Sequence, residues 1–216
     1  MIMKCAIPSF GADSRLVSGF AVDDDRPVFR IFVPLEQSDG TFRSWTACTE
    51  AVGIRMHPLL RWSSVRRKAM ARGIDVGTPA MGKVCRSFIR GFFDLLPEFE
   101  CLPGCFALWS DYADPEPDGA HLTVNRIPRS SSNFLCDGSF YLYRNLLGWA
   151  MSRSFENNLR FPVALWPDTG LFTVAAPIYT DSLYITCEDS VYSRLKFGGL
   201  DILPIDRAAT CPSEGD

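Results

Sequence analysis

The stretch RFPVALWPDTGLFTVAAP, residues 160–177, decides which fold class the sequence adopts. Two apolar runs, 160–166 and 171–177, lie on either side of the turn sequence Pro-Asp-Thr-Gly. Apolar runs of this length, separated by a short segment that ends in glycine, are typical of two strands joined by a tight turn. The stretch therefore predicts a β-hairpin.

Segments on both sides of the hairpin supply further strands. We expect CFALWSD, 105–111, to lie in the same sheet as the hairpin, with Phe134, Phe140 and Leu147 packed beneath that sheet. Strand-like runs also occur within 18–48, in HLTVN, in DSLYITC and in KFGGLDILPI.

Two segments before the hairpin have the apolar spacing of helices, with an apolar residue every three or four positions. The first, 57–72, ends before Gly73 and places four apolar residues near one face: Leu59, Trp62, Val65 and Met70. The second, 83–96, ends before Pro97 and carries an apolar stripe formed by Val84, Phe88 and Phe92.

A third amphipathic helix is predicted over 140–153, with Asp137 or Ser139 as its N-cap. No internal repeat or linker-like stretch divides the chain. We therefore expect a single α+β domain over 1–206, built on a central mixed or antiparallel sheet with packed helices, and a disordered polar tail over 207–216.

Composition excludes several classes of protein. Of the 216 residues, 47% are hydrophobic and 22% charged, which is ordinary for a globular protein. The net charge of −3 gives the chain no general attraction to nucleic acid, and no apolar run approaches the ~20 residues that span a bilayer.

The eight cysteines are expected to be reduced thiols of an intracellular protein, because the N-terminus lacks the apolar core of a signal peptide. A zinc site would need four ligands. Cys101 and Cys105, with His121 downstream, form one candidate pair, but a second pair is missing. We therefore predict no metal and no cofactor.

Basic residues are concentrated between Arg55 and Asp94, where only Asp75 and Asp94 oppose nine cations: Arg55, Arg61, Arg66, Arg67, Lys68, Arg72, Lys83, Arg86 and Arg90. This basic helical face, 55–90, is a candidate site for an acidic partner. The alternative is an ordinary solvated helix surface, balanced by acidic loops elsewhere in the chain.

The sequence has no glycine-rich phosphate loop, no HExxH and no G-x-S-x-G motif. A polar segment, RSSSN at 129–133, lies between Pro128 and Phe134. It has the composition of a loop, and its side chains supply four ligand-binding candidates: Arg129, Ser131, Ser132 and Asn133.

The order of strand 105–111, the motif PRSSSNF at 128–134, a helix and the strand FTVAAP at 172–177 resembles the plast family. These are the RolB/RolC-type proteins encoded on the T-DNA of crown-gall (Ti) and hairy-root (Ri) plasmids. The likeness spans 105–186. It implies expression in the cytosol or nucleus of transformed plant cells, where such proteins alter growth and the responses to the phytohormones auxin and cytokinin.

The resemblance leaves several activities open. The chain is expected to bind host plant proteins or a small hormone-related ligand. Alternatively, it is an enzyme on the same fold, either a glucosidase acting on hormone conjugates or an ADP-ribosyltransferase-like protein that would use NAD. A third alternative, outside the family, is a mobile-element inhibitor of a bacterial protein.

The ADP-ribosyltransferase-like alternative implies three catalytic candidates. In an ADP-ribosyltransferase-like site, Trp109 would match the position on the first core strand and Ser139 would match the position of the hydroxyl group. Glu188 would match the carboxylate that comes late in the chain. Trp109 replaces the usual arginine and cannot clamp a pyrophosphate. Ser139 has a second interpretation, in which its hydroxyl caps the helix over 140–153. A glycosidase would instead need two carboxylates across a cleft, and no motif marks such a pair.

Overall fold

A computed structural model of the chain describes residues 8–11, 13, 15–22, 24–79, 82–96, 104–109, 125–126, 140–144, 159–177 and 180–212. Its main feature is one eight-stranded sheet in which every neighbouring pair of strands is antiparallel. Across the sheet the strands are β12 (Ile202–Pro204), β1 (Val28–Phe32), β11 (Ser182–Cys187), β10 (Phe172–Ala175), β9 (Ala164–Pro167), β5 (Gly104–Trp109), β7 (Phe140–Arg144) and β6 (Asn125–Arg126).

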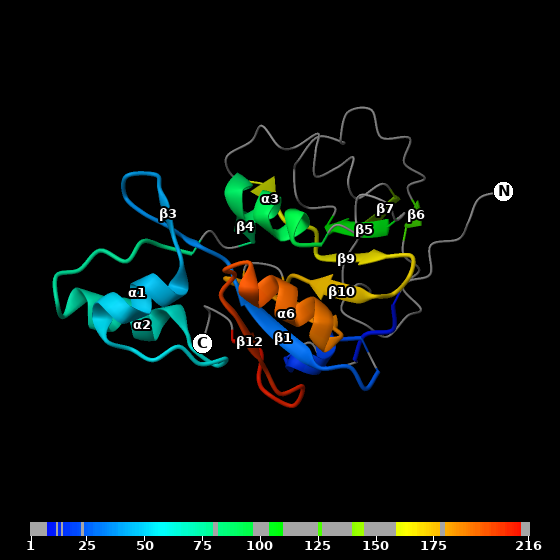
Figure 1. The fold of residues 1–216 in the computed structure, drawn as a ribbon, viewed down its shortest axis with the longest axis horizontal. Coiled ribbons are helices and arrows are strands. Elements are labelled where there is room, and N and C mark those ends of the chain that lie inside the picture. The colour runs from blue at the N-terminus through cyan, green and yellow to red at the C-terminus, as the bar shows by residue number, and fades with distance from the viewer. Residues whose placement is uncertain are drawn as a thin grey trace.

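Shorter elements complete the described fold (Figure 1). Two small antiparallel pairs are β2 (Leu35–Glu36) with β3 (Phe42–Arg43), and β4 (Lys83–Val84) with β8 (Leu159–Arg160). The helices are η1 (Val17–Phe20), α1 (Trp45–Val52), α2 (Trp62–Met70), α3 (Arg86–Asp94) and α6 (Asp189–Phe197). The α+β class expected from the sequence is confirmed.

The predicted hairpin over 160–177 is confirmed as β9 and β10, which pair through Val174 and Leu165. The turn between them uses Gly170 in the left-handed region, at φ 68°. β9 also pairs with β5, so the hairpin and the strand that contains CFALW share one sheet, as expected.

Alternation along the strands gives the sheet two apolar faces. On β11, Leu183 and Ile185 join a core with buried side chains of α3 and α6, whereas Tyr184 joins the core on the opposite face. That second core is completed by Val17 and Phe20 of η1 and by the C-terminal segment. Helices α3 and α6 therefore cover one face of the sheet (Figure 1).

Helices α1 and α2 form a lobe at one end of the molecule (Figure 1). Ser44 caps α1 by accepting a hydrogen bond from the Ala47 amide at 3.1 Å, and Gly53 ends it in the left-handed conformation at φ 62°. Trp45 and Trp62 make an edge-to-face contact inside this lobe, with ring centroids 5.9 Å apart. The apolar core of this lobe includes Phe32 of β1, with Leu203 of β12 packed against it, so the lobe is joined to the end of the sheet.

The helix predicted over 140–153 is wrong for its first residues, because Phe140–Arg144 form β7, paired with β5 on one side and β6 on the other. The run FYLYR is rich in aromatic residues, which favour strands. Over only five residues, its apolar spacing fits both the helical period and the strand period. The segment forms a strand because it can pair with the edge of β5. Phe134 and Leu147, expected beneath the sheet, lie outside the described residues.

The polar tail predicted to be disordered from 207 is ordered over 207–212. The Val17 amide donates to the Ala209 carbonyl at 2.9 Å, and the Cys211 amide donates to the Arg15 carbonyl at 2.8 Å. Cys211 is buried beside the Tyr184 hydroxyl, 3.2 Å from its sulfur. Burial of the Cys211 side chain in the second core and these backbone hydrogen bonds account for the order.

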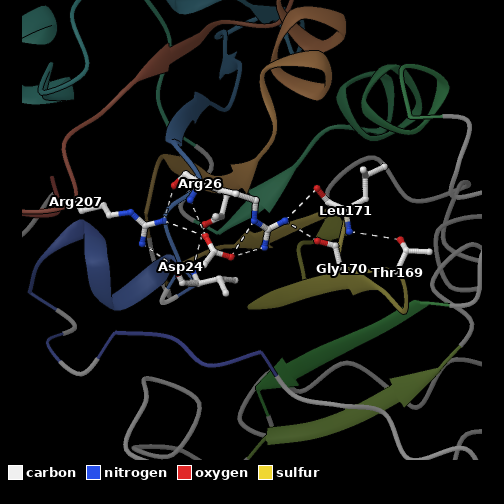
Figure 2. A network of polar contacts seen from close by, with 8 residues as sticks. Asp24, Arg26, Thr169, Gly170, Leu171 and Arg207 are labelled. Atoms are coloured by element: carbon white, nitrogen blue, oxygen red, sulfur yellow. Dashed lines mark hydrogen bonds and ion pairs between the residues drawn. The ribbon is translucent and has the colours of Figure 1, made fainter.

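A network around Asp24 fixes the acidic turn before β1 (Figure 2). The Asp24 carboxylate accepts from Arg26 Nη2 at 2.7 Å and pairs with Arg207 Nη2 at 3.5 Å. Arg26 Nη1 also donates to the carbonyls of Gly170 and Leu171, in the turn between β9 and β10. Burial raises the pKa of the Asp24 carboxyl, but the hydrogen bonds and charge of Arg26 and the charge of Arg207 outweigh it, so the pKa lies below 3.8.

We expect Asp24→Asn to lower the free energy of unfolding at pH 7 by up to about 1 kcal/mol, the range of partly exposed ion pairs. Because the folded-state pKa is lowered, this stabilisation is present above the unfolded-state pKa and is lost as pH falls through the folded-state pKa. The free energies of unfolding of the wild type and the variant, measured with urea, should therefore differ at pH 7, and the difference should shrink as the pH falls below the unfolded-state pKa of the carboxyl group. Asp25→Asn is the control, since Asp25 is exposed and has no ion pair within the described residues. An equal loss in both variants would contradict the prediction.

Candidate functional site

The structure places two of the predicted catalytic residues at opposite ends of strands that lie three positions apart in the sheet. Trp109 is the last residue of β5 and pairs with Phe140. Glu188 follows β11, where it is the exposed N-cap residue of α6 and makes no capping hydrogen bond with its side chain.

Strand register gives the separation of these two residues. Ile185, Val174, Leu165 and Phe106 form one row across β11, β10, β9 and β5. β5 runs antiparallel to β11, so Trp109 lies three residues below this row and Glu188 three residues above it. With ~3.3 Å per residue and ~4.8 Å per strand, their Cα atoms are about 25 Å apart. The structure does not bring Trp109 and Glu188 into one site.

Ser139, the third catalytic candidate, lies outside the described residues, as do the loop candidates Arg129, Ser131, Ser132 and Asn133. The ligand-binding role of the loop remains a prediction. The capping role proposed for Ser139 is wrong, because the residue that follows it, Phe140, begins a strand rather than a helix.

Among the cysteines that the structure describes, one differs from the expectation. Cys48, Cys85, Cys187 and Cys211 are free thiols, whereas Cys105 is disulfide-bonded, so the prediction of eight reduced thiols is wrong. Sequence spacing could not show this, because a disulfide depends on which sulfur atoms the fold brings together. Burial raises the pKa of Cys187 to about 12 and that of Cys48 to about 11, which makes both thiols poor nucleophiles at neutral pH.

Within the described parts of the chain, no cluster of three or more histidine, cysteine or carboxylate side chains could hold a metal ion. None of the helices described is both long and apolar enough to cross a membrane.

The basic residues predicted as an acidic-partner site are concentrated on the α1–α2 lobe. Between Gly53 and Ile74 the chain has no acidic residue and six cations, all exposed or half-buried: Arg55, Arg61, Arg66, Arg67, Lys68 and Arg72. Lys68 also has a structural role, because its Nζ donates to the carbonyl of Gly53, the C-cap residue of α1, at 2.8 Å. The charged residues between Gly53 and Ile74 are therefore all positive.

Two apolar side chains lie among these cations. Met70 is 71% exposed and Leu59 49% exposed, so neither shares the buried face of Trp62 and Val65, with which the predicted apolar spacing grouped them. Helix α2 begins only at Trp62, which leaves Leu59 in the preceding turn. The buried positions on α2 are Trp62, Val65 and Ala69, and Met70 is rotated by about 100° from Ala69 on the helix.

Helical spacing groups Met70 with two arginines. Arg66 and Arg67 precede Met70 by four and three residues, which places them on the same side of α2. Ser63 precedes the two arginines by three and four residues. We call these four residues, Ser63, Arg66, Arg67 and Met70, the α2 surface. No hydrogen bond or ion pair within the described residues occupies either guanidinium.

A fully buried arginine anchors the lobe to the sheet. Arg30, in the centre of β1, donates from Nη1 to the carbonyls of Pro58 and Leu60 at 2.8 and 2.7 Å, in the turn that leads into α2. Its Nη2 pairs with Asp181 at 3.0 Å and its Nε donates to the Ser182 hydroxyl at 2.8 Å. The chain direction into α2, and hence the orientation of the α2 surface, depends on this side chain.

Sequence reasoning missed Arg30, although a signal was present. Arg30 is a single charged residue in the otherwise apolar run VFRIF, 28–32. A charge at the centre of a buried strand must have partners, because an unpaired buried charge is very costly. Its partners lie about 30 and 150 positions away, and one sequence does not identify them.

Comparisons of the chain with protein-family models, curated proteins and solved structures produced no match.

Proposed function

We propose that the chain acts by binding an acidic segment of a partner protein on the α2 surface. The observation that carries this proposal is the exposed Met70 bordered by Arg66 and Arg67 on a lobe without opposing acidic residues between Gly53 and Ile74. The biological setting we propose is the one that the plast resemblance implies, the altered growth of a transformed plant cell. There the partner would be a host protein.

The chemistry of the α2 surface matches an amphipathic acidic segment. Two arginines can form charge-assisted, bidentate hydrogen bonds with carboxylates, which lysines cannot do in the same geometry. Methionine adapts to apolar partners of different shape, and its exposure leaves apolar area for a partner to cover. Because exposed charges are screened, we expect the complex to weaken as the salt concentration rises.

One of the enzyme alternatives has less support than binding. The ADP-ribosyltransferase-like alternative, with its NAD, required Trp109, Ser139 and Glu188 to converge. The sheet register keeps Trp109 and Glu188 about 25 Å apart. Binding needs no such convergence, since the four residues of the α2 surface belong to one helix.

Expression of the wild-type chain in leaf tissue tests the proposal. We expect abnormal growth, and we expect Arg67→Glu to abolish it. Reversing one charge in an interface of complementary charge should lower the amount of host partner co-purified from leaf extract by about ten- to a hundredfold. The fold should be unaffected, since exposed substitutions usually change stability by less than about 0.5 kcal/mol.

Lys196→Glu is the matched control, because it makes the same change of charge at an exposed position on α6. Abnormal growth and partner capture should persist in this variant. Normal growth with the wild-type chain would contradict the proposed setting. Abnormal growth that survives Arg67→Glu would contradict the role of the α2 surface.

A further inference from the structure

We propose that a groove on the outer side of α3 binds a small anionic ligand, a carboxylate or phosphate attached to an apolar group. The groove has a volume of about 550 Å³ and is lined by Phe42, Arg86, Ser87, Arg90, Gly91 and Asp94. It shares no residue with the α2 surface, so the two proposals stand or fail separately.

The lining of the groove follows from the helical period. The residues of α3 at 86, 87, 90, 91 and 94 lie on one side of the helix, whereas Phe88, Ile89, Phe92 and Phe93 are buried on the other. The buried aromatic side holds α3 against the sheet, with Phe92 in edge-to-face contact with Phe161 at 6.4 Å between ring centroids. Because its aromatic side is packed against the sheet, α3 holds its polar side in a fixed position along the groove.

The positive charge in the groove points to an anion. Arg86 and Arg90 lie one helical turn apart and give the groove two cations on the same side of α3. Arg90 is exposed, and no hydrogen bond or ion pair within the described residues engages its guanidinium, although Asp94 follows one turn later. A bound carboxylate or phosphate can pair with the guanidinium of Arg90.

The start of α3 adds hydrogen-bond donors to the same end of the groove. The N-cap residue, Cys85, makes no capping hydrogen bond with its side chain. The Ser87 hydroxyl lies 3.3 Å from the Cys85 sulfur, a weak partner that an anion can replace. The amides of the first turn of a helix favour negative charge, in agreement with the two arginines.

Gly91 provides independent evidence that the groove side of α3 is free of packed side chains. A glycine inside a helix costs about 1 kcal/mol relative to alanine. Gly91 has no positive φ, and a Cβ placed on it would meet nothing within 4 Å, so neither the backbone nor close packing requires glycine there. Its small size leaves the floor of the groove free.

Phe42 supplies the apolar wall. It lies on β3 and is half-buried against the core that α3 also joins, and it lines the groove together with residues of α3. An aromatic or aliphatic group attached to the anion would cover this wall. We therefore expect an apolar anion to bind more tightly than inorganic phosphate.

Calorimetric titration with phenyl phosphate, benzoate and inorganic phosphate tests the proposal. We expect saturable binding of phenyl phosphate or benzoate in the millimolar range or tighter, and weaker binding of inorganic phosphate. The first two ligands distinguish a phosphate source from a carboxylate source. No saturable binding of either, or equal affinity for phenyl phosphate and inorganic phosphate, would overturn the proposal.

Two variants locate the site. Arg90→Gln should weaken binding by about tenfold or more, since it removes a charge-assisted hydrogen bond. Gly91→Leu should weaken binding to a similar extent while raising the melting temperature, because leucine favours the helix and fills the groove. Unchanged affinity in both variants would overturn the proposal even if the ligand binds. Lys196→Gln, which removes a cation from α6, is the control and should bind as the wild type does.

Discussion

Replacing Arg30 by methionine is expected to lower the free energy of unfolding by about 3–5 kcal/mol, the range for breaking a buried ion pair from one side. Arg30 is fully buried and Asp181 nearly so, at 0% and 5% exposed. Removal of the guanidinium leaves the Asp181 carboxylate with the Ser182 hydroxyl at 2.6 Å as its remaining side-chain partner. The carbonyls of Pro58 and Leu60 lose their donor as well.

Urea unfolding followed by tryptophan fluorescence measures this effect. Trp45 and Trp62 lie in the lobe that Arg30 anchors, and the Arg30 guanidinium lies 4.2 Å from the Phe32 ring centroid beside them. We expect the emission of these tryptophans to shift at a lower urea concentration in the variant.

A double-mutant cycle with Asp181→Asn gives the control for Arg30. Each single substitution leaves one buried charge without its partner, whereas Arg30→Met/Asp181→Asn leaves neither charge. The double variant should therefore lose less stability than the sum of the two single losses. Strict additivity would contradict the account of Arg30 as one half of a buried charge pair.

Gly77→Ala is expected to cost about 2–4 kcal/mol, from the sum of a left-handed backbone and a steric clash. Gly77 has φ 75°, and a Cβ on it would meet the Glu36 carbonyl oxygen without room for either atom. That carbonyl accepts the Thr78 amide at 2.7 Å, so it cannot move without breaking a hydrogen bond between β2 and the segment after α2. The variant should unfold at a lower temperature by several degrees.

Gly73→Ala provides a matched control, because it has the same strain without the clash. Gly73 has φ 64°, but a Cβ there meets nothing within 4 Å. Its cost should be about 1 kcal/mol, from the left-handed conformation alone. Equal losses of stability at the two positions would show that the contact with Glu36 does not matter.

Helices and strands could be predicted from the sequence where the pattern of apolar residues and turn signals lies within one short segment. The hairpin of β9 and β10 was predictable because a turn signal separates two apolar runs. Helices α2 and α3 were predictable because their apolar residues recur with the helical period. Helix α1 was missed because 18–48 was interpreted as strand-like, although Trp45, Cys48 and Val52 have helical spacing and Ser44 and Gly53 mark the ends of the helix. The cations that surround Met70 were identified, but the exposure of Met70 was not.

By itself, the sequence determined the α+β class, the hairpin over 160–177 and the concentration of positive charge before residue 94, because each depends on residues close together in the chain. Tertiary structure alone decided that Phe140–Arg144 form a strand, since a five-residue run takes the conformation that an open sheet edge offers it. It also decided which distant residues meet. Hydrogen-bond register joins Arg30 to Asp181 and keeps Trp109 far from Glu188, and no local pattern in one chain specifies the register between strands so far apart in sequence.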